Sequence, residues 1–175
     1  PTDATPQAHD LPIVGAPQTV QGLNGDALQF DGAADGLNVP DSEYINTRGT
    51  AVFPNRTVIA VFKCDDVDAP GKQTVFEEGG TTRGSNIYVS EGLLYVAAWN
   101  RAEYNWAGEW PSTSIESGEW YVAAMVIREG GEAVEPDKFE MWLNGELIAK
   151  LPGGQMHDHG DDGAVGYSQV NTVFH

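Results

Sequence analysis

Three short aspartate-rich loops are candidates for binding a metal ion. They are Asp31-Gly-Ala-Ala-Asp35, Asp65-Asp66-Val67-Asp68, and the run 157–162, which contains Asp158, Asp161 and Asp162. Calcium takes several oxygen ligands at once, and irregular loops supply both carboxylates and backbone carbonyls. The sequence therefore predicts calcium as a cofactor. The expected metal ligands are Asp31, Asp35, Asp158, Asp161 and Asp162.

Each loop also has a simpler interpretation. Asp31 could cap its own loop as an Asx turn instead of binding calcium, and both alternatives stand. The loop 65–68 lacks a glycine for tight wrapping and is interpreted as a solvated loop. His157 and His159 lie two positions apart, a spacing that on a strand places both imidazoles on one face and suits zinc or copper. The run 157–162 is therefore a solvated loop, a calcium site or a transition-metal site.

The segment from Trp99 to Trp110 is a candidate ligand-binding loop. It combines three tryptophans and one tyrosine with arginine and asparagine. Ligand sites generally join an apolar wall to a few well-placed polar groups, and a sugar needs both, for its ring face and for its hydroxyls. The predicted ligand-binding residues are Arg101, Tyr104, Asn105, Trp106 and Trp110.

The same aromatic residues have structural alternatives. Trp99 and Trp110 could end strands and pack inside the protein, because tryptophan is usually well buried. Tyr104 and Trp106 lie among asparagine and glycine, so we expect them to be exposed and to contact the ligand. For Trp142, on the polar face of its strand, both roles stay open.

No catalytic arrangement is readable from the sequence. A retaining glycosidase needs two carboxyl groups about 5–5.5 Å apart. Glu77 and Glu78 are adjacent, so on a strand they point to opposite faces. Cys64 precedes Asp65 and Asp66, whose negative charge raises a thiol pKa and weakens the nucleophile. We therefore expect no enzymatic activity.

The composition fits one acidic domain. The chain has 175 residues, and 9 Lys and Arg against 26 Asp and Glu give a net charge of −17. This charge repels phosphate, so nucleic acid and anionic membranes are poor partners. The single cysteine excludes an intramolecular disulfide, and every apolar run is far shorter than the about 20 residues of a membrane-spanning helix. Residues 1–18 show no signal-peptide pattern and are expected to be a linker before a domain at 19–175.

Short β-strands are the elements expected to position these residues. Gly-rich turns separate them, and Asn144-Gly145 is the strongest hairpin signal. This spacing predicts an all-β sandwich or barrel. The β-branched run 57–63 predicts a strand buried on both faces. The expected strands are 11–14, 27–30, 36–39, 57–63, 74–77, 86–90, 93–99, 120–128, 138–143, 164–167 and 170–174.

Several of these patterns, in this order, resemble the laminin G-like, concanavalin A-like lectin and glucanase superfamily. They are GDALQFDG at 25–32, TVIAVFK at 57–63, GEWYVA at 118–123 and FEMWLNGE at 139–146. The resemblance implies two antiparallel sheets in a jelly-roll β-sandwich, with Trp120 and Tyr121 on a core strand. It also implies a mostly non-catalytic fold that binds sugars, peptides or proteins, commonly with calcium.

The family pattern ends with one strand more than this chain contains. The resemblance therefore implies that the last strand is missing, or that another domain or chain completes the sheet. Together with the acidic composition, it predicts a non-catalytic, calcium-dependent, lectin- or adhesin-like module of a larger extracellular or cell-surface protein. Its expected partner is a glycan or peptide, with no nucleic acid and no membrane insertion. The alternatives are a glycoside hydrolase or polysaccharide lyase of the same fold, and a structural spacer in an adhesin.

Overall fold

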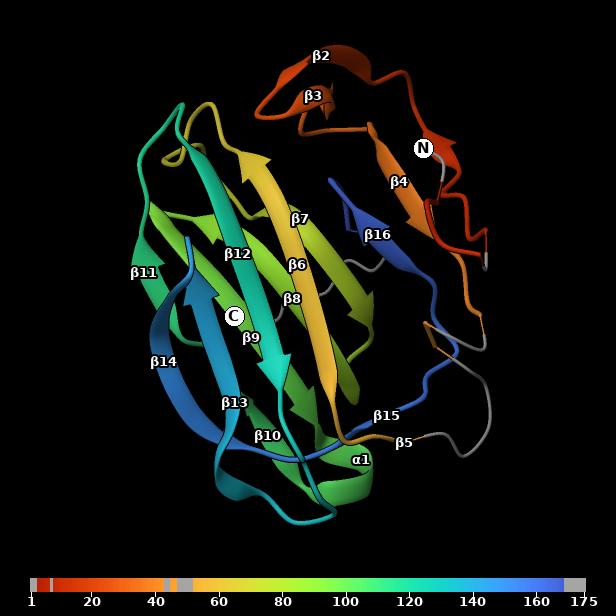
Figure 1. The fold of residues 1–175 in the computed structure, drawn as a ribbon, viewed down its shortest axis with the longest axis vertical. Coiled ribbons are helices and arrows are strands. Elements are labelled where there is room, and N and C mark those ends of the chain that lie inside the picture. The colour runs from red at the N-terminus through yellow and green to blue at the C-terminus, as the bar shows by residue number, and fades with distance from the viewer. Residues whose placement is uncertain (1–2, 7, 43–44, 47–51, 169–175) are drawn as a thin grey trace.

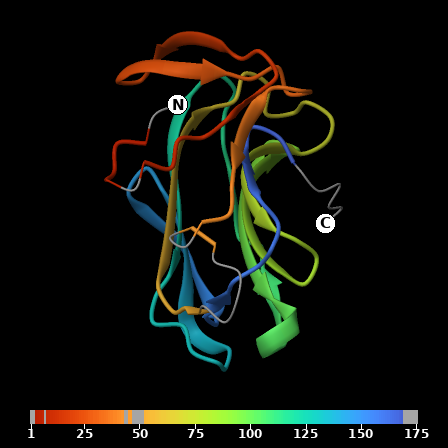
Figure 2. The same cartoon turned by 90° about the vertical axis from the view of Figure 1, so that its right-hand side faces the viewer.

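The computed structural model describes residues 3–6, 8–42, 45–46 and 52–168. Two antiparallel sheets stack around a main apolar core, and Figure 2 shows the two layers side by side. The predicted all-β, two-sheet antiparallel sandwich is confirmed. The strand predicted at 170–174 lies outside the described residues.

The larger sheet has eight strands. Seven follow the order β1-β4-β16-β7-β8-β9-β10, and β11 also pairs with β9. Ile13 in β1 pairs with Leu37 in β4, so part of the segment predicted as a linker belongs to the sheet. The strand bounds are β1 Ile13–Val14, β4 Gly36–Val39, β7 Gln73–Gly79, β8 Arg83–Ser90, β9 Leu93–Asn100, β10 Trp106–Glu109, β11 Ser112–Ser114 and β16 Gly163–Val165.

The smaller sheet has the order β14-β13-β12-β6 and forms the front layer in Figure 1. Its strands are β6 Arg56–Lys63, β12 Trp120–Ile127, β13 Glu135–Leu143 and β14 Glu146–Gly153. Asn144 and Gly145, with φ of 51° and 84°, close the hairpin between β13 and β14. Positive φ at both central residues is what the Asn-Gly signal predicts.

Two small strand pairs and one helix complete the described part of the chain. β2 Gln18–Gly22 pairs with β3 Gly25–Gln29, and β5 Val52–Phe53 pairs with β15 Met156–His157. The helix is α1 Arg101–Tyr104. In this part of the chain no helix has the length and apolar character needed to cross a bilayer.

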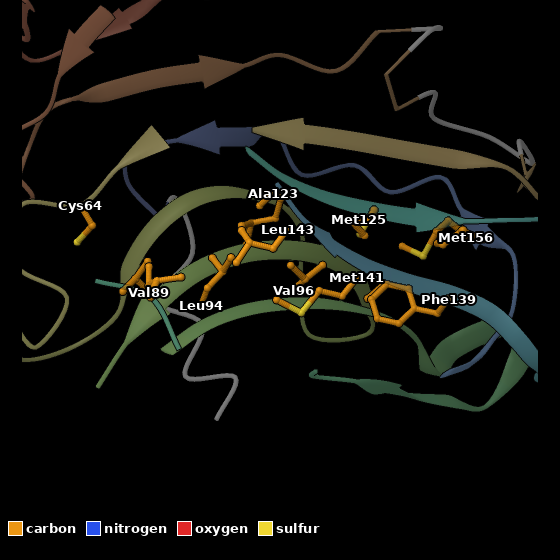
Figure 3. Packing of buried hydrophobic residues seen from close by; sticks show 14 of the residues in the cluster. Cys64, Val89, Leu94, Val96, Ala123, Met125, Phe139, Met141, Leu143 and Met156 are labelled. Atoms are coloured by element: carbon orange, nitrogen blue, oxygen red, sulfur yellow. The ribbon is translucent and has the colours of Figure 1, made fainter. Parts of the chain in front are cut away.

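The core lies between the two sheets and follows the alternation of their strands. Each large apolar side chain that is fully buried contributes roughly 1.5–3 kcal/mol to folding. The central residues, seen in Figure 3, are Val89, Leu94 and Val96 from the larger sheet, and Ala123, Met125, Phe139, Met141 and Leu143 from the smaller sheet.

The prediction that run 57–63 is buried on both faces is wrong. Exposure alternates along β6, and Ile59 and Val61 are 64% and 55% exposed. Val58, Ala60 and Phe62 point the other way and pack against the core. Burial on both faces is typical of parallel sheets, whereas an antiparallel sheet can leave one face in water. β6 follows the second pattern.

Candidate functional site

The aromatic loop folds as a short helix followed by a strand. Asn100 caps α1, its Oδ1 accepting a hydrogen bond from the Glu103 N–H at 3.4 Å, and Asn105 ends the helix with φ of 54°. Asparagine suits both positions, because it caps helices through its side chain and tolerates the left-handed conformation. Arg101 Nε donates to the Ala107 carbonyl at 3.2 Å and ties α1 to β10. These hydrogen bonds link α1 to the strands on either side of it.

Trp106 does not lie on the surface of this loop. It is 2% exposed, and its ring packs edge-on against Phe139 with centroids 6.0 Å apart. The prediction that Trp106 is exposed is wrong, because it begins a strand and alternation turns its side chain into the core. The next residue, Ala107, is exposed instead. Trp106 is thus a core residue.

Trp110 lies against Trp99 rather than beside Tyr104. The two rings stack with centroids 6.0 Å apart and form a small apolar cluster separate from the main core. Trp99 Nε1 donates to the Gly80 carbonyl at 2.9 Å. A Cβ at Gly108 would lie 2.4 Å from the Trp110 ring, so only glycine permits this close approach. The geometry favours the structural interpretation of both tryptophans.

Tyr104 contacts the segment that leads into the run 157–162. Gln155 Nε2 donates to the Tyr104 hydroxyl at 2.7 Å, and the His157 ring lies 6.5 Å from the Tyr104 ring. Asn100 Nδ2 donates to the Gln155 carbonyl at 3.3 Å. This hydrogen bond connects the aromatic loop to the segment that precedes β15. Figure 1 shows α1, β5 and β15 at this same end of the sandwich. We call the following residues the rim cluster: Arg101, Tyr104, Asn105, Gln155 and His157.

The rim cluster is partly open to solvent. Arg101 and Asn105 are exposed, Tyr104 and His157 are partly buried, and Gln155 is buried. The sequence did not single out Gln155, since no local pattern marks it. Its importance appears only when Tyr104, its partner in the folded chain, is known.

Asp31 caps its own loop at the far end of the sandwich. Its Oδ1 accepts hydrogen bonds from the N–H groups of Ala33, Ala34 and Asp35 at 2.9, 2.9 and 3.0 Å. These hydrogen bonds lower the pKa of the Asp31 carboxyl below its ordinary value, and the bond from the Ala34 N–H has the largest effect. Asp35 Oδ1 in turn accepts from the Ala16 N–H at 2.7 Å. The Asx-turn alternative for Asp31 is therefore the geometry observed.

The two histidines of the run 157–162 diverge. His157 belongs to β15 and lies next to Tyr104, whereas His159 follows the strand and its Nδ1 lies 2.6 Å from Asn46 Nδ2. The strand condition under which both imidazoles would share one face is not met, because β15 ends at His157 and strand alternation stops there. This arrangement does not suit a transition metal held by both rings.

The aspartates of the same run are also directed to different partners. The buried Asp158 has its Oδ1 2.5 Å from His157 Nδ1. Asp162 accepts from Asn38 Nδ2 at 3.1 Å and from the Asp41 N–H at 3.3 Å, whereas Asp161 is exposed. These contacts tie the run 157–162 to the larger sheet.

The predicted metal ligands do not assemble into one site. Among the described residues, no group of three or more His, Cys, Asp or Glu side chains is arranged to hold a metal ion. Asp31 and Asp35 follow β3, whereas Asp158 follows β15 near the opposite end in Figure 1. Calcium binding, which can also use backbone carbonyls, stays a prediction.

A buried charged network centres on Glu78 in β7. Glu78 is 2% exposed, contacts the Arg56 guanidinium, and accepts a hydrogen bond from Ser85 Oγ at 2.7 Å. His159 Nε2 lies 3.9 Å from the same carboxylate. The His159 N–H donates to Asn46 Oδ1 at 2.8 Å. The Glu78 carboxylate thus contacts buried or partly buried side chains, and we assign it a structural role.

Comparison with known proteins identifies the fold but not a family. No family model and no curated protein matches this chain. The receptor-binding domain of botulinum neurotoxin C/D mosaic serotype is similar in structure, with a TM-score of 0.68, 13% identity, and coverage of 94% of this chain and 40% of that one.

Two further solved structures are similar over the same share of the chain. The binding domain of Paraclostridial Mosquitocidal Protein 1 has a TM-score of 0.63 and 14% identity, covering 94% of this chain and 44% of that one. The botulinum neurotoxin serotype G binding domain has a TM-score of 0.55 and 9% identity, with 94% and 41% covered. This chain spans less than half the length of these proteins. At such identities the likeness establishes the β-sandwich fold alone.

Proposed function

We propose that this domain is a non-catalytic binding module and that its ligand is a carbohydrate held at the rim cluster. One observation carries the proposal: the hydrogen bond from Gln155 holds the Tyr104 ring near His157, in the same short helical segment as the exposed residues Arg101 and Asn105. Aromatic faces accept the C–H face of a sugar, and amide and guanidinium groups bond its hydroxyls. A site fixed before binding loses less conformational entropy on association.

The carboxylates support a binding role over the hydrolase and lyase alternatives. Glu78 is buried against Arg56 and Ser85, so it is not available to a substrate. Glu77 is the next residue of the same strand, and its side chain points to the other face of the sheet. Turnover of a polysaccharide, measured as new reducing ends or unsaturated products, would contradict this part of the proposal.

A glycan array with matched variants tests the ligand class. We expect the wild-type domain to bind a subset of glycans, and Tyr104→Ala and Arg101→Ala to lose at least tenfold in affinity. Lys72→Ala removes one positive charge from an exposed lysine before β7, away from the rim cluster, and serves as the control. Equal loss in the control, or binding only on a parallel peptide array, would contradict a carbohydrate site at the rim. No ligand on either array would favour the spacer alternative.

The wider context and the role of calcium are separate parts of the proposal. We place the domain in a larger extracellular or cell-surface protein, which accords with its charge of −17 and with its similarity to parts of longer binding proteins. Calcium dependence is proposed because of the acidic loops, although no three of the described His, Cys, Asp or Glu side chains form a metal-binding group. It is therefore tested independently of glycan binding.

A further inference from the structure

Among the described residues, β6 ends the smaller sheet with one side unpaired. All eight of its residues pair with β12, from Arg56 opposite Ile127 to Lys63 opposite Trp120. No strand of the described chain pairs with its other side, and Figure 1 shows β6 as the last strand of the front layer. The N-terminal strand β1 pairs with β4 in the larger sheet and does not cover this edge. The edge therefore offers a row of backbone N–H and C=O groups to another strand.

The two edges of the smaller sheet differ in how they are protected. Soluble proteins protect edge strands with charged residues, proline or bulges. The opposite edge, β14, has all three: it carries Glu146, Lys150 and Pro152, and its pairing with β13 shifts register at Met141/Trp142. Between Thr57 and Phe62, β6 carries none of them, and its pairing with β12 is regular throughout.

We propose that β6 pairs with the β6 strand of a second copy of this chain, antiparallel across a twofold axis. The two four-stranded sheets then join into one continuous sheet. A twofold interface requires that the same surface be complementary to itself. The β6 sequence meets this requirement in one register.

That register places Ala60 on the twofold axis. Ile59 of each copy then lies opposite Val61 of the other, and Thr57 lies opposite Lys63. Cross-strand pairs of β-branched residues stabilise antiparallel sheets, and no like charges face each other. A shift by two residues sets Arg56 or Lys63 opposite an apolar residue. A register shifted by one residue pairs side chains that face solvent on one copy with side chains that face the core on the other.

The charge distribution also favours this edge for self-association. Each copy carries −17, so most surfaces of two copies repel each other. β6 contains no Asp or Glu, and its Arg56 is engaged with the buried Glu78. Two copies therefore meet here with apolar side chains and without Asp or Glu on the paired strands. Added salt screens the remaining repulsion, so it should strengthen the dimer.

The mass in solution tests the proposal. Light scattering during size-exclusion chromatography should give a dimer, and the dimer fraction should rise between 0.1 and 1 M NaCl. Ile59→Lys and Val61→Lys should give monomers with unchanged circular dichroism, because both side chains are exposed in one copy. Leu147→Lys, a matched substitution at a 45% exposed apolar residue on β14, should remain dimeric. A wild-type monomer at 200 μM, or a dimer that survives Ile59→Lys, would overturn it.

Cross-linking tests the register. In a Cys64→Ala background, oxidation of a mixture of Ile59→Cys and Val61→Cys proteins should form a disulfide between copies. Either variant alone should do so at least fivefold more slowly, because residues directly opposite are the closest. Equal rates for the mixture and the single variants would contradict a twofold axis at Ala60.

Discussion

Gln155 Nε2 donates a hydrogen bond of 2.7 Å to the hydroxyl of Tyr104, 51 positions earlier in the chain. This bond joins the helix of the aromatic loop to the segment that enters β15. Gln155 is buried, so its amide depends on this partner for a hydrogen bond inside the protein. The position of the Tyr104 ring, and with it the proposed sugar site, follows from this contact.

Tyr104→Phe should separate the role of the hydroxyl from that of the ring. The substitution leaves a buried amide donor unpaired, which costs about 1–3 kcal/mol in the free energy of unfolding. Urea unfolding measures this loss. Tyr95→Phe is the control, because the Tyr95 ring stacks on Tyr88 and should keep that contact. An equal loss in both variants would mean that the bond to Gln155 has no particular weight.

Trp106 should matter for stability and not for ligand binding. Trp106→Ala removes a ring that packs against Phe139 in the core, and a substitution of this kind costs about 3–5 kcal/mol. The milder Trp106→Phe should lower the free energy of unfolding by less and leave glycan affinity within twofold of wild type. Both quantities are measured on the same preparations. A tenfold loss of glycan affinity in folded Trp106→Phe would contradict this prediction and indicate that Trp106 takes part in binding.

Arg56→Met should be among the most destabilising substitutions. It leaves the buried Glu78 carboxylate without its guanidinium partner, and breaking a buried pair on one side costs about 3–5 kcal/mol. Adding Glu78→Gln should recover much of this loss, since the remaining charge is then gone. Lys63→Met breaks an exposed contact of 3.6 Å with Asp65 and should cost less than about 1 kcal/mol. Chemical denaturation of the four proteins completes the comparison.

Asp31 should contribute to stability in a pH-dependent way. Its pKa is lowered in the folded protein, chiefly by the hydrogen bond from the Ala34 N–H, so folding favours the ionised form. The contribution is complete above the unfolded-state pKa of about 3.9 and is lost as pH falls through the lower folded-state value. The difference in melting temperature between wild type and Asp31→Ala should therefore shrink from pH 6 to pH 2.5. A constant difference would show that the charge on Asp31 plays no part.

Calcium binding, as proposed from the acidic loops, predicts a thermal shift. At a concentration 100 times Kd, a ligand specific for the folded state adds about 2.7 kcal/mol, which raises the melting temperature by several degrees. Melting in EDTA and in 1 mM calcium measures it, with magnesium as the control cation. Asp31→Ala should abolish the shift if Asp31 and Asp35 bind calcium, and Asp161→Ala if the run 157–162 does. Identical melting curves would end the calcium proposal.

The sequence by itself determined the all-β class and most strand positions. Alternation and turn residues act between near neighbours, and so Asn144-Gly145 could be recognised as a hairpin before its strands were paired. The Asx turn at Asp31 was foreseen as one of two alternatives for the same reason. Both depend on a few consecutive residues.

Only the tertiary structure decided which candidate residues meet. Trp106 turned into the core while Tyr104 met Gln155, because the second sheet covers one side of β10 and α1 lies at its end. Ile59 became exposed because it points away from the core, on a face that an antiparallel sheet can leave in water, which no local pattern of β-branched residues reveals. Exposure and contact depend on which strands pair and on which layer covers them. That information lies in residues far apart in the chain.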